Sequence, residues 1–395
     1  MSALPFHTYL WKVASRCNID CTYCYVYNLG DETWKTQPHL MSPKTAQRVA
    51  ERMREHLELH RKTDASIVFH GGEPMMLGAA RMSKLVQQIR SVFEDSKIEL
   101  TFGMQSNLLL FSEDIGEVMT RARMSVGVSI DGPPRINDLH RIDRKGRGTG
   151  VQLEQKLQLL LSERFRNLFA GFLCVIDIDV APEEVLDYLL MFNPRSIDFL
   201  LPLNNHDSRP KGKTASIEAT PYGDWLIRCF NRWVESGSKT RIRFFNSIIQ
   251  MLCGRATSVE SLGLLPVDII VIETNGDIDA VDALKAAFPG AARLGFSVFQ
   301  NNFEEVALHS GVRARQMGAE SLCERCRRCD LVDVCGGGYL PHRYGSATGF
   351  DNPSVYCADL MKLIRHIKRM IAEEIRISRS NTSMSPIADD LVVGR

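Results

Sequence analysis

Apolar, β-branched segments alternate with helical stretches along the N-terminal half of the chain. Residues 42–62 predict an amphipathic helix, with Ser42 as N-cap and Pro43 at its first position. Strands that alternate with helices form parallel βα units. The pattern therefore predicts an α/β protein with a partial (β/α)6 barrel. The six predicted strands are residues 7–15, 65–70, 97–105, 125–130, 170–177 and 197–203.

The rest of the chain has a different pattern, and we expect it to divide into further regions. Residues 1–240 should form the barrel, with a loop at 204–220, and residues 241–320 should form a bridging region with a β-hairpin. Residues 321–377, rich in Cys and Gly, predict a cysteine-rich lobe that ends in a helix near 356–377. Residues 378–395 predict a mobile tail.

Charge and hydropathy exclude several classes of protein. The chain has 48 Lys and Arg against 47 Asp and Glu, which gives no reason to expect nucleic acid or a membrane surface as a partner. No apolar run approaches the roughly 18 residues that a membrane span needs. No signal peptide is evident before Cys17. We therefore expect a cytoplasmic protein.

The 11 cysteines are unevenly placed. A disulfide framework is not expected, because the cytosol keeps thiols reduced. Three cysteines lie within residues 17–24 and five within 323–357, which indicates metal binding. Cys174, Cys229 and Cys253 stand alone in apolar or helical surroundings and predict buried structural residues.

The first cluster, Cys17, Cys21 and Cys24, has the spacing C-x3-C-x2-C and follows the first predicted strand. Structural zinc usually has four protein ligands, so three thiolates leave one coordination position open. In an iron–sulfur cube, one iron would then be free for a small chelating ligand. The turns HGGEP, QSN and SIDG follow the next three strands, at the barrel edge where reactive groups gather.

This cysteine motif, with GGEP about 50 residues later, resembles the radical S-adenosylmethionine (SAM) superfamily. The resemblance implies a [4Fe–4S] cluster on Cys17, Cys21 and Cys24, whose open iron chelates SAM and yields a 5′-deoxyadenosyl radical. It implies that Glu73 accepts hydrogen bonds from the SAM ammonium and that Arg141 binds its carboxylate, although Arg141 is equally compatible with a surface residue. The residues expected to bind SAM are Tyr23, Gly71, Gly72, Glu73, Pro74, Asn107, Ser129, Asp131 and Arg141.

The second cluster has Cys326, Cys329 and Cys335 in the spacing C-x2-C-x5-C, followed by Cys357. Four thiolates fill a cube and give a closed cluster for electron transfer. The pattern is similar to one half of a SPASM domain, or to a twitch-like lobe. Val281 and Tyr339 stand where the other half would have cysteines, so we predict one auxiliary [4Fe–4S] cluster. Cys323 is surplus and could replace Cys326, and zinc binding remains an alternative.

Three segments, VIETNG…VDALK, CGGGYLPHRY and GFDNPSVYCADL, resemble the FxsB-type branch of radical SAM/SPASM peptide maturases. The resemblance implies an oxidoreductase that abstracts a side-chain hydrogen from a ribosomal precursor peptide and forms a cyclophane, an aromatic ring joined to a β-carbon. A flavodoxin or ferredoxin would supply electrons. The alternative is sulfatase-maturing-type oxidation of a Ser or Cys in a protein substrate. A non-catalytic scaffold would leave the SAM motifs unexplained.

Asp282 is the candidate catalytic base. It follows Val281, and in sulfatase-maturing relatives the matching Cys-Asp pair supplies a carboxylate to the active site. A carboxylate within hydrogen-bond reach of the substrate would be a competent base. The competing interpretation is a solvated aspartate beside a hairpin, because Asn275–Gly276 is a hairpin signal.

Overall fold

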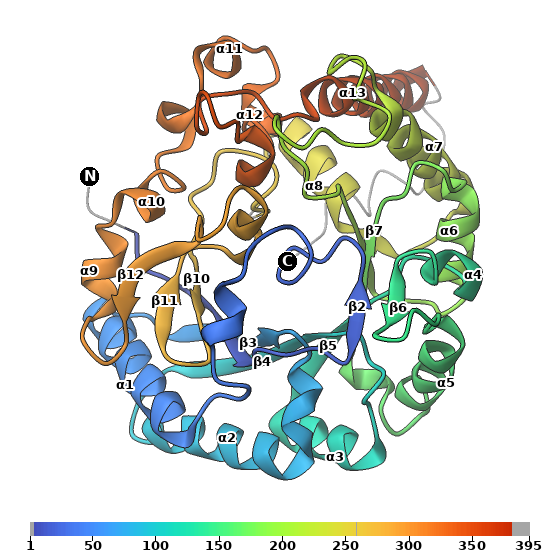
Figure 1. Cartoon of the computed structure of the whole chain (residues 1–395). Helices are drawn as coiled ribbons and strands as arrows, with labels where there is room; N and C mark the ends of the chain where they lie inside the picture. Colours follow the sequence, from blue (N-terminus) through green and yellow to red (C-terminus); the bar gives the residue numbers. More distant parts are fainter. Residues whose placement is uncertain (1–3, 258, 381–395) are drawn as a thin grey trace.

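A computed structural model describes residues 4–257 and 259–380 of the chain. Its central feature is a sheet of ten strands in the order β12-β11-β10-β1-β3-β4-β5-β7-β8-β9, which curves into an incomplete barrel with helices around its outside (Figure 1). The predicted α/β barrel is confirmed. Its six core strands are β1 Thr8–Ala14, β3 Asp64–Gly71, β4 Glu99–Ser106, β5 Met124–Ser129, β7 Phe169–Val175 and β8 Ser196–Leu200.

The core strands pair in parallel, and each is followed by helical structure that returns the chain to the start of the next strand. This is the arrangement that alternating strand and helix patterns predict. The helices around these strands are α1 Pro43–Leu59, α2 Gly78–Val92, α3 Glu113–Ala122, α4 Pro134–Asn137, α5 Gly150–Leu160, α6 Pro182–Leu190, α7 Pro221–Ser236 and α8 Arg243–Leu252, with the short 3-10 turns η1 Thr33–Thr36, η2 Pro74–Leu77 and η3 Arg166–Leu168.

Helix α1 forms where the sequence predicts it. The Ser42 hydroxyl accepts a hydrogen bond from the Thr45 backbone N–H at 3.0 Å, which satisfies one free donor at the helix start, and Pro43 is the first helical residue. Apolar residues recur every three or four positions along the helix, so they lie on one face, and this face is buried. These residues are Ala46, Val49, Ala50, Met53 and Leu57.

The region expected to bridge the barrel and the lobe adds strands to the barrel itself. Strand β10 Ile269–Ile272 pairs in parallel with β1, and β11 Asp277–Asp279 and β12 Arg293–Ser297 continue the sheet as antiparallel strands. The predicted hairpin is therefore present. The exact domain boundaries stay a prediction, because the bridging region shares the barrel sheet. Two short strand pairings complete the description: β9 Arg241–Ile242 joins β8, and β2 Ile19–Cys21 pairs with β6 Arg141–Asp143.

The cysteine-rich lobe consists of short helices and one long one. The long helix, α13 Cys357–Ser380, extends beyond the predicted end near 377. The predicted tail at 378–395 begins inside this helix, and residues 381–395 lie outside the described residues. The remaining elements of this half are η4 Asp282–Ala286, α9 Phe303–Ala307, α10 Ser310–Arg313, η5 Gly318–Ser321, α11 Glu324–Arg327, α12 Val332–Cys335 and η6 Leu340–Arg343.

A buried ion pair fixes the 204–220 loop to the first turn of α13. The Lys213 ammonium lies 2.5 Å from a carboxylate oxygen of Asp359, both side chains are fully buried, and the second carboxylate oxygen accepts the Gly223 N–H at 2.8 Å. Because Asp359 is two residues after Cys357, this contact also positions a predicted cluster ligand. The predicted loop therefore has a structural role.

We expect Lys213→Met to destabilise the protein by about 3–5 kcal/mol, because it leaves the Asp359 carboxylate buried without a countercharge. Chemical unfolding would measure this loss. The double variant Lys213→Met/Asp359→Asn removes both charges and should recover part of the stability. A double variant that is less stable than the sum of the two single changes would contradict the ion-pair explanation.

The three solitary cysteines differ in burial. Cys174 and Cys229 are buried in the core, as predicted. Cys253 is exposed, so that prediction is wrong, because this residue follows the last turn of α8 at its solvent-facing end.

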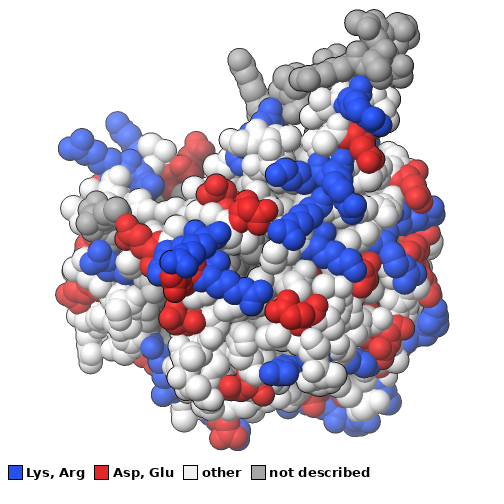
Figure 2. Space-filling view, turned by 90° about the horizontal axis from the view of Figure 1, so that it is seen from above, with Lys and Arg blue, Asp and Glu red and all other residues white. Residues whose placement is uncertain are grey.

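The surface matches the balanced charge of the sequence. Acidic and basic side chains are intermixed over the face in Figure 2. Within the described residues, no helix is long and apolar enough to cross a membrane.

Candidate active site

A cavity of about 420 Å³ lies at the C-terminal edge of the barrel strands. Its wall includes residues at the ends of β3, β4 and β5, represented by Gly72, Asn107 and Asp131. This is the edge at which parallel barrels place their reactive groups. The turns that the sequence singled out after successive strands therefore meet in one place.

The three N-terminal cysteines line this cavity. Cys17, Cys21 and Cys24 follow β1, and the side-chain amide of Asn107 donates to the Cys17 Sγ at 3.6 Å. The neighbouring turn has no room for a side chain at Gly72, because an added Cβ would lie 2.2 Å from the Arg16 carbonyl oxygen. The close approach of this turn to the cysteine loop is the physical reason for a glycine there. The donor set fits an iron–sulfur cluster with three protein ligands.

Tyr23, Asp131 and Arg141 form a hydrogen-bonded chain at the cavity. The Tyr23 hydroxyl donates to an Asp131 carboxylate oxygen at 2.5 Å, and the Arg141 guanidinium donates to the Tyr23 oxygen at 2.9 Å. Burial raises the pKa of Asp131, and Arg141 opposes that shift. Arg141 is 6% exposed, so the surface interpretation is wrong and its charge belongs to the site.

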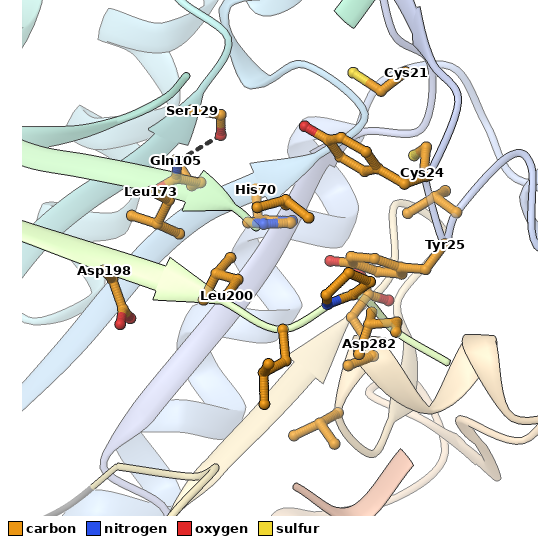
Figure 3. Close-up of a pocket in the computed structure, with 18 of the residues that line it drawn as sticks. Cys21, Cys24, Tyr25, His70, Gln105, Ser129, Leu173, Asp198, Leu200 and Asp282 are labelled. Atoms are coloured by element: carbon orange, nitrogen blue, oxygen red, sulfur yellow. Dashed lines mark hydrogen bonds between the residues drawn. The ribbon is translucent and has the colours of Figure 1, made fainter. Parts of the chain in front are cut away.

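Ser129 and Gln105 line the cavity across from Cys24 and Tyr25 (Figure 3). The Gln105 side-chain amide donates to the Ser129 hydroxyl oxygen at 2.8 Å, which leaves the hydroxyl proton of Ser129 free to donate into the cavity. Gly127 leaves space for this glutamine, because an added Cβ would lie 2.4 Å from the Gln105 side-chain oxygen.

Glu73 is held by hydrogen bonds within the protein. Its carboxylate is fully buried and does not line the cavity. It accepts the Met75 N–H at 2.9 Å, the Asn107 N–H at 2.9 Å and the Ser106 hydroxyl at 2.7 Å. In this structure the carboxylate is held by protein donors, and the expected contact with the SAM ammonium stays a prediction. Pro74 starts η2 and also lies outside the cavity wall.

A buried cluster of charged side chains reaches the cavity at Asp282. The Lys12 ammonium lies 2.5 Å from an Asp282 carboxylate oxygen and 3.0 Å from Glu273. The Lys285 ammonium lies 3.1 Å from the same Asp282 oxygen and 2.5 Å from Glu273. Asp282 lines the cavity and is 5% exposed, so the solvated-hairpin interpretation is wrong.

The protonation states in this charge cluster follow from its geometry. Burial alone would raise the pKa of Asp282, but Lys12 and Lys285 outweigh burial and hold that pKa well below its usual range. Asp279 lies farther from Lys285, at 3.8 Å, and burial together with Glu273 raises its pKa to about 7. Near neutral pH, the two lysines therefore face two fully ionised carboxylates and one that titrates.

The five C-terminal cysteines come together in the lobe. Burial first, and then nearby cysteine thiols, raise the pKa values of Cys326 and Cys335 to about 12. Cys323 is among the neighbours of Cys326, so the structure leaves both as possible ligands. Val281 and Tyr339 line the cavity, and the Tyr339 hydroxyl donates to Glu260 at 3.4 Å. A hydrophobic and a polar side chain occupy the positions where a second auxiliary cluster would need thiolates.

Sequence reasoning missed several residues that line the cavity and two lysines of the charge cluster beside it. Lys12 was visible as a charge within an apolar strand, and His70 as the polar end of another, but neither pattern indicates a partner. Asp198 lies in β8 and pairs with Arg243 at 2.9 Å. The missed residues are Lys12, Tyr25, His70, Gln105, Asp198, Arg243 and Lys285.

Comparison with known proteins agrees with this geometry. Residues 11–190 match the radical SAM superfamily. The cysteine-type anaerobic sulfatase-maturating enzyme of Clostridium perfringens (strain 13 / Type A) is 24% identical over 341 residues, which are 85% of this chain and 88% of that protein. The serine-type enzyme of Bacteroides thetaiotaomicron is 23% identical over 387 residues, covering 92% and 90%.

Solved structures show the same fold. The structure of native anSMEcpe with bound AdoMet has a TM-score of 0.78 at 21% identity, covering 93% of this chain and 98% of that chain. The complex of the same protein with AdoMet and Cp18Cys peptide has a TM-score of 0.77 at 22% identity, covering 93% and 99%.

These comparisons correct the predicted function. Relatives that match most of this chain are named sulfatase-maturating enzymes, so the cyclophane prediction is wrong and the FxsB-type branch is not confirmed. The motifs behind that prediction belong to a fold that this chain shares with the sulfatase-maturating enzymes. A shared fold does not determine which bond an enzyme forms in its substrate. The predicted cofactors, SAM with its [4Fe–4S] cluster and an auxiliary [4Fe–4S] cluster, are confirmed. Over residues 11–190, which carry the three N-terminal cysteines and most of the barrel strands, this chain is similar to the radical SAM superfamily.

Proposed function

We propose that this protein oxidises a serine or cysteine side chain in a peptide or protein substrate, as a radical SAM enzyme of the sulfatase-maturating type. The observation that carries the proposal is a single cavity with Cys17, Cys21 and Cys24 on its wall and the Asp282 carboxylate also on its wall. The cluster on the three cysteines, which generates the radical, and the Asp282 carboxylate, which can assist removal of a proton, would then act on the same substrate residue. The names of the relatives support the substrate class.

The part of the cavity that the N-terminal cysteines line is the proposed SAM site. Cys17, Cys21 and Cys24 would hold the cluster, which with SAM supplies a 5′-deoxyadenosyl radical able to remove a hydrogen atom. The Arg141 guanidinium offers a cation to the SAM carboxylate. The Ser129 hydroxyl offers a hydrogen-bond donor to the ribose. The other residues proposed to contact SAM are Tyr23, Gly71, Gly72, Asn107 and Asp131.

The C-terminal lobe is the proposed electron-transfer site. Cys326, Cys329, Cys335 and Cys357 would hold one auxiliary [4Fe–4S] cluster, with Cys323 beside them. A protein-liganded cluster of this kind accepts or passes single electrons. A flavodoxin or ferredoxin in the cytoplasm would reduce the SAM cluster.

Asp282 is proposed to assist the loss of the proton that completes the oxidation, through the negative charge of its carboxylate. Removal of one hydrogen atom from the substrate β-carbon leaves a radical that must still lose one electron and one proton. The ionised Asp282 carboxylate supplies negative charge at the cavity wall, where that proton leaves.

The test uses two synthetic peptides that differ only at the target position, Ser or Cys, with an alanine peptide as control. The anaerobically reconstituted protein, with SAM and a reductant, should oxidise the Ser peptide to an aldehyde, or the Cys peptide to a thioaldehyde that water hydrolyses to the same aldehyde with release of H2S. The aldehyde reacts with a hydrazine probe. The serine product should be lighter by two hydrogens in mass spectrometry. SAM cleavage with both peptides, but no aldehyde from either, would refute the proposed function.

A further inference from the structure

His70 is a cavity residue to which the motifs assign no role. It lies in β3, directly before Gly71, and Figure 3 shows its ring pointing into the cavity. Its Nδ1 is buried and has no hydrogen-bond partner among the described residues. Buried polar atoms in proteins are nearly always paired, so an unpaired ring nitrogen in a substrate cavity calls for a partner that the substrate would bring.

The charges around His70 belong to the buried charge cluster on one side of it. Asp282 and Lys285 lie in η4, Lys12 lies in β1, and Glu273 follows β10. Burial lowers the pKa of His70, the two lysines act in the same direction, and the carboxylates of Asp282 and Glu273 oppose them. The resting imidazole is therefore neutral, and one ring nitrogen has a free lone pair. The Asp282 and Glu273 carboxylates would stabilise the imidazolium once the ring gains a proton.

The Asp282 carboxylate is less suited to accept the proton directly. One of its oxygens already lies within 2.5 Å of the Lys12 ammonium and 3.1 Å of the Lys285 ammonium. These ion pairs stabilise the charged form of Asp282 and make it a weak base. Its negative charge can still act on a neighbouring imidazolium, because the interaction of His70 with Asp282 favours the protonated ring.

We propose that His70 contacts the hydroxyl or thiol of the target residue and accepts its proton during oxidation, with Asp282 stabilising the imidazolium that forms. This inference rests on the proposed function. When SAM and its cluster are bound, they would supply the radical that takes the β-carbon hydrogen atom, and an auxiliary cluster held by the lobe cysteines would take the remaining electron. The O–H or S–H proton goes to His70. The single carbon–oxygen or carbon–sulfur bond becomes a double bond.

A second cavity histidine, His342, provides the rival assignment. Both of its ring nitrogens also lack hydrogen-bond partners among the described residues. Its surroundings are different, because its ring packs against Tyr356 at 4.8 Å and against Tyr339 at 5.5 Å between centroids. Burial lowers the pKa of His342 to about 3; the backbone carbonyl of Pro202 opposes this shift, and Arg343 adds to it. His342 therefore lacks the negative partner that His70 has.

The test compares His70→Gln with the wild-type protein on the matched Ser and Cys peptides. Glutamine keeps a hydrogen-bonding group but cannot hold the proton. We expect 5′-deoxyadenosine formation to stay within about twofold of wild type, while oxidation of the Ser peptide falls by about 10²–10⁴-fold, the usual contribution of a general base. The loss should be smaller for the Cys peptide, because a thiol with a pKa of about 8.5 releases its proton more readily.

Chemical rescue and a matched control complete the experiment. Imidazole added to His70→Ala should restore oxidation of the Ser peptide, whereas His366→Gln, on α13 outside the cavity wall, should behave as wild type. Equal losses for both peptides, failure of rescue, or a serine-selective loss in His342→Gln instead would overturn the assignment to His70. A wild-type protein that oxidises neither peptide refutes the proposed function and the role of His70 with it.

Discussion

Replacing Cys17, Cys21 and Cys24 with alanine will abolish SAM cleavage and remove about half of the iron. Three thiolates for one cube and four for another imply about eight irons per chain after anaerobic reconstitution, and the triple variant should keep about four. The triple variant removes the cavity thiolates and leaves the C-terminal lobe intact. Iron analysis and 5′-deoxyadenosine formation measure the two effects separately.

The matched control for this variant is Cys253→Ala, because Cys253 is exposed and outside both clusters. It should keep about eight irons and normal SAM cleavage. About twelve irons in the wild-type protein would contradict a single auxiliary cluster. Residual SAM cleavage by the triple variant would contradict the assignment of the three cavity cysteines.

Periodicity was sufficient to predict the barrel. In β3, Ala65, Ile67 and Phe69 are buried at alternate positions, and this period of two is visible in the sequence. The cysteine spacing was equally informative, because three thiolates within eight residues can converge through local backbone alone. Local patterns therefore located both the strands and the N-terminal cysteines.

The charge cluster could not be predicted in the same way. Lys12 and Glu273 are 261 residues apart and meet because β10 pairs with β1. An isolated lysine in an apolar strand indicates a buried partner, since unpaired charges are rarely buried, but the sequence does not identify that partner. The same limit explains Glu73, whose carboxylate is held in part by Ser106 from the next strand. Long-range pairing decides these roles.

Asp282→Asn will separate SAM cleavage from substrate oxidation. Asparagine nearly preserves the shape of the side chain but removes the charge that faces the cavity and opposes the two lysines. The radical can still form, because Asp282 is ion-paired with Lys12 and Lys285, neither of which is proposed to bind SAM. The proton of the oxidised residue, however, then meets two cations that have lost this countercharge. We expect 5′-deoxyadenosine at near wild-type rates and a loss of aldehyde of about 10²-fold or more. Deuterium exchange at the abstracted position would mark radicals that return to starting material.

Loss of stability is the competing explanation, and Asp279→Asn distinguishes the two. Asp279 belongs to the same buried charge cluster, at 3.8 Å from Lys285, but it does not line the cavity. The same substitution there removes a carboxylate that titrates near neutral pH, since its pKa is about 7. Its effect on oxidation should be small at pH values below that pKa, where the group is already protonated. Equal losses of aldehyde in both variants would assign Asp282 to folding, whereas loss in Asp282→Asn alone, with unchanged unfolding, shows that the charge at the cavity wall completes the reaction.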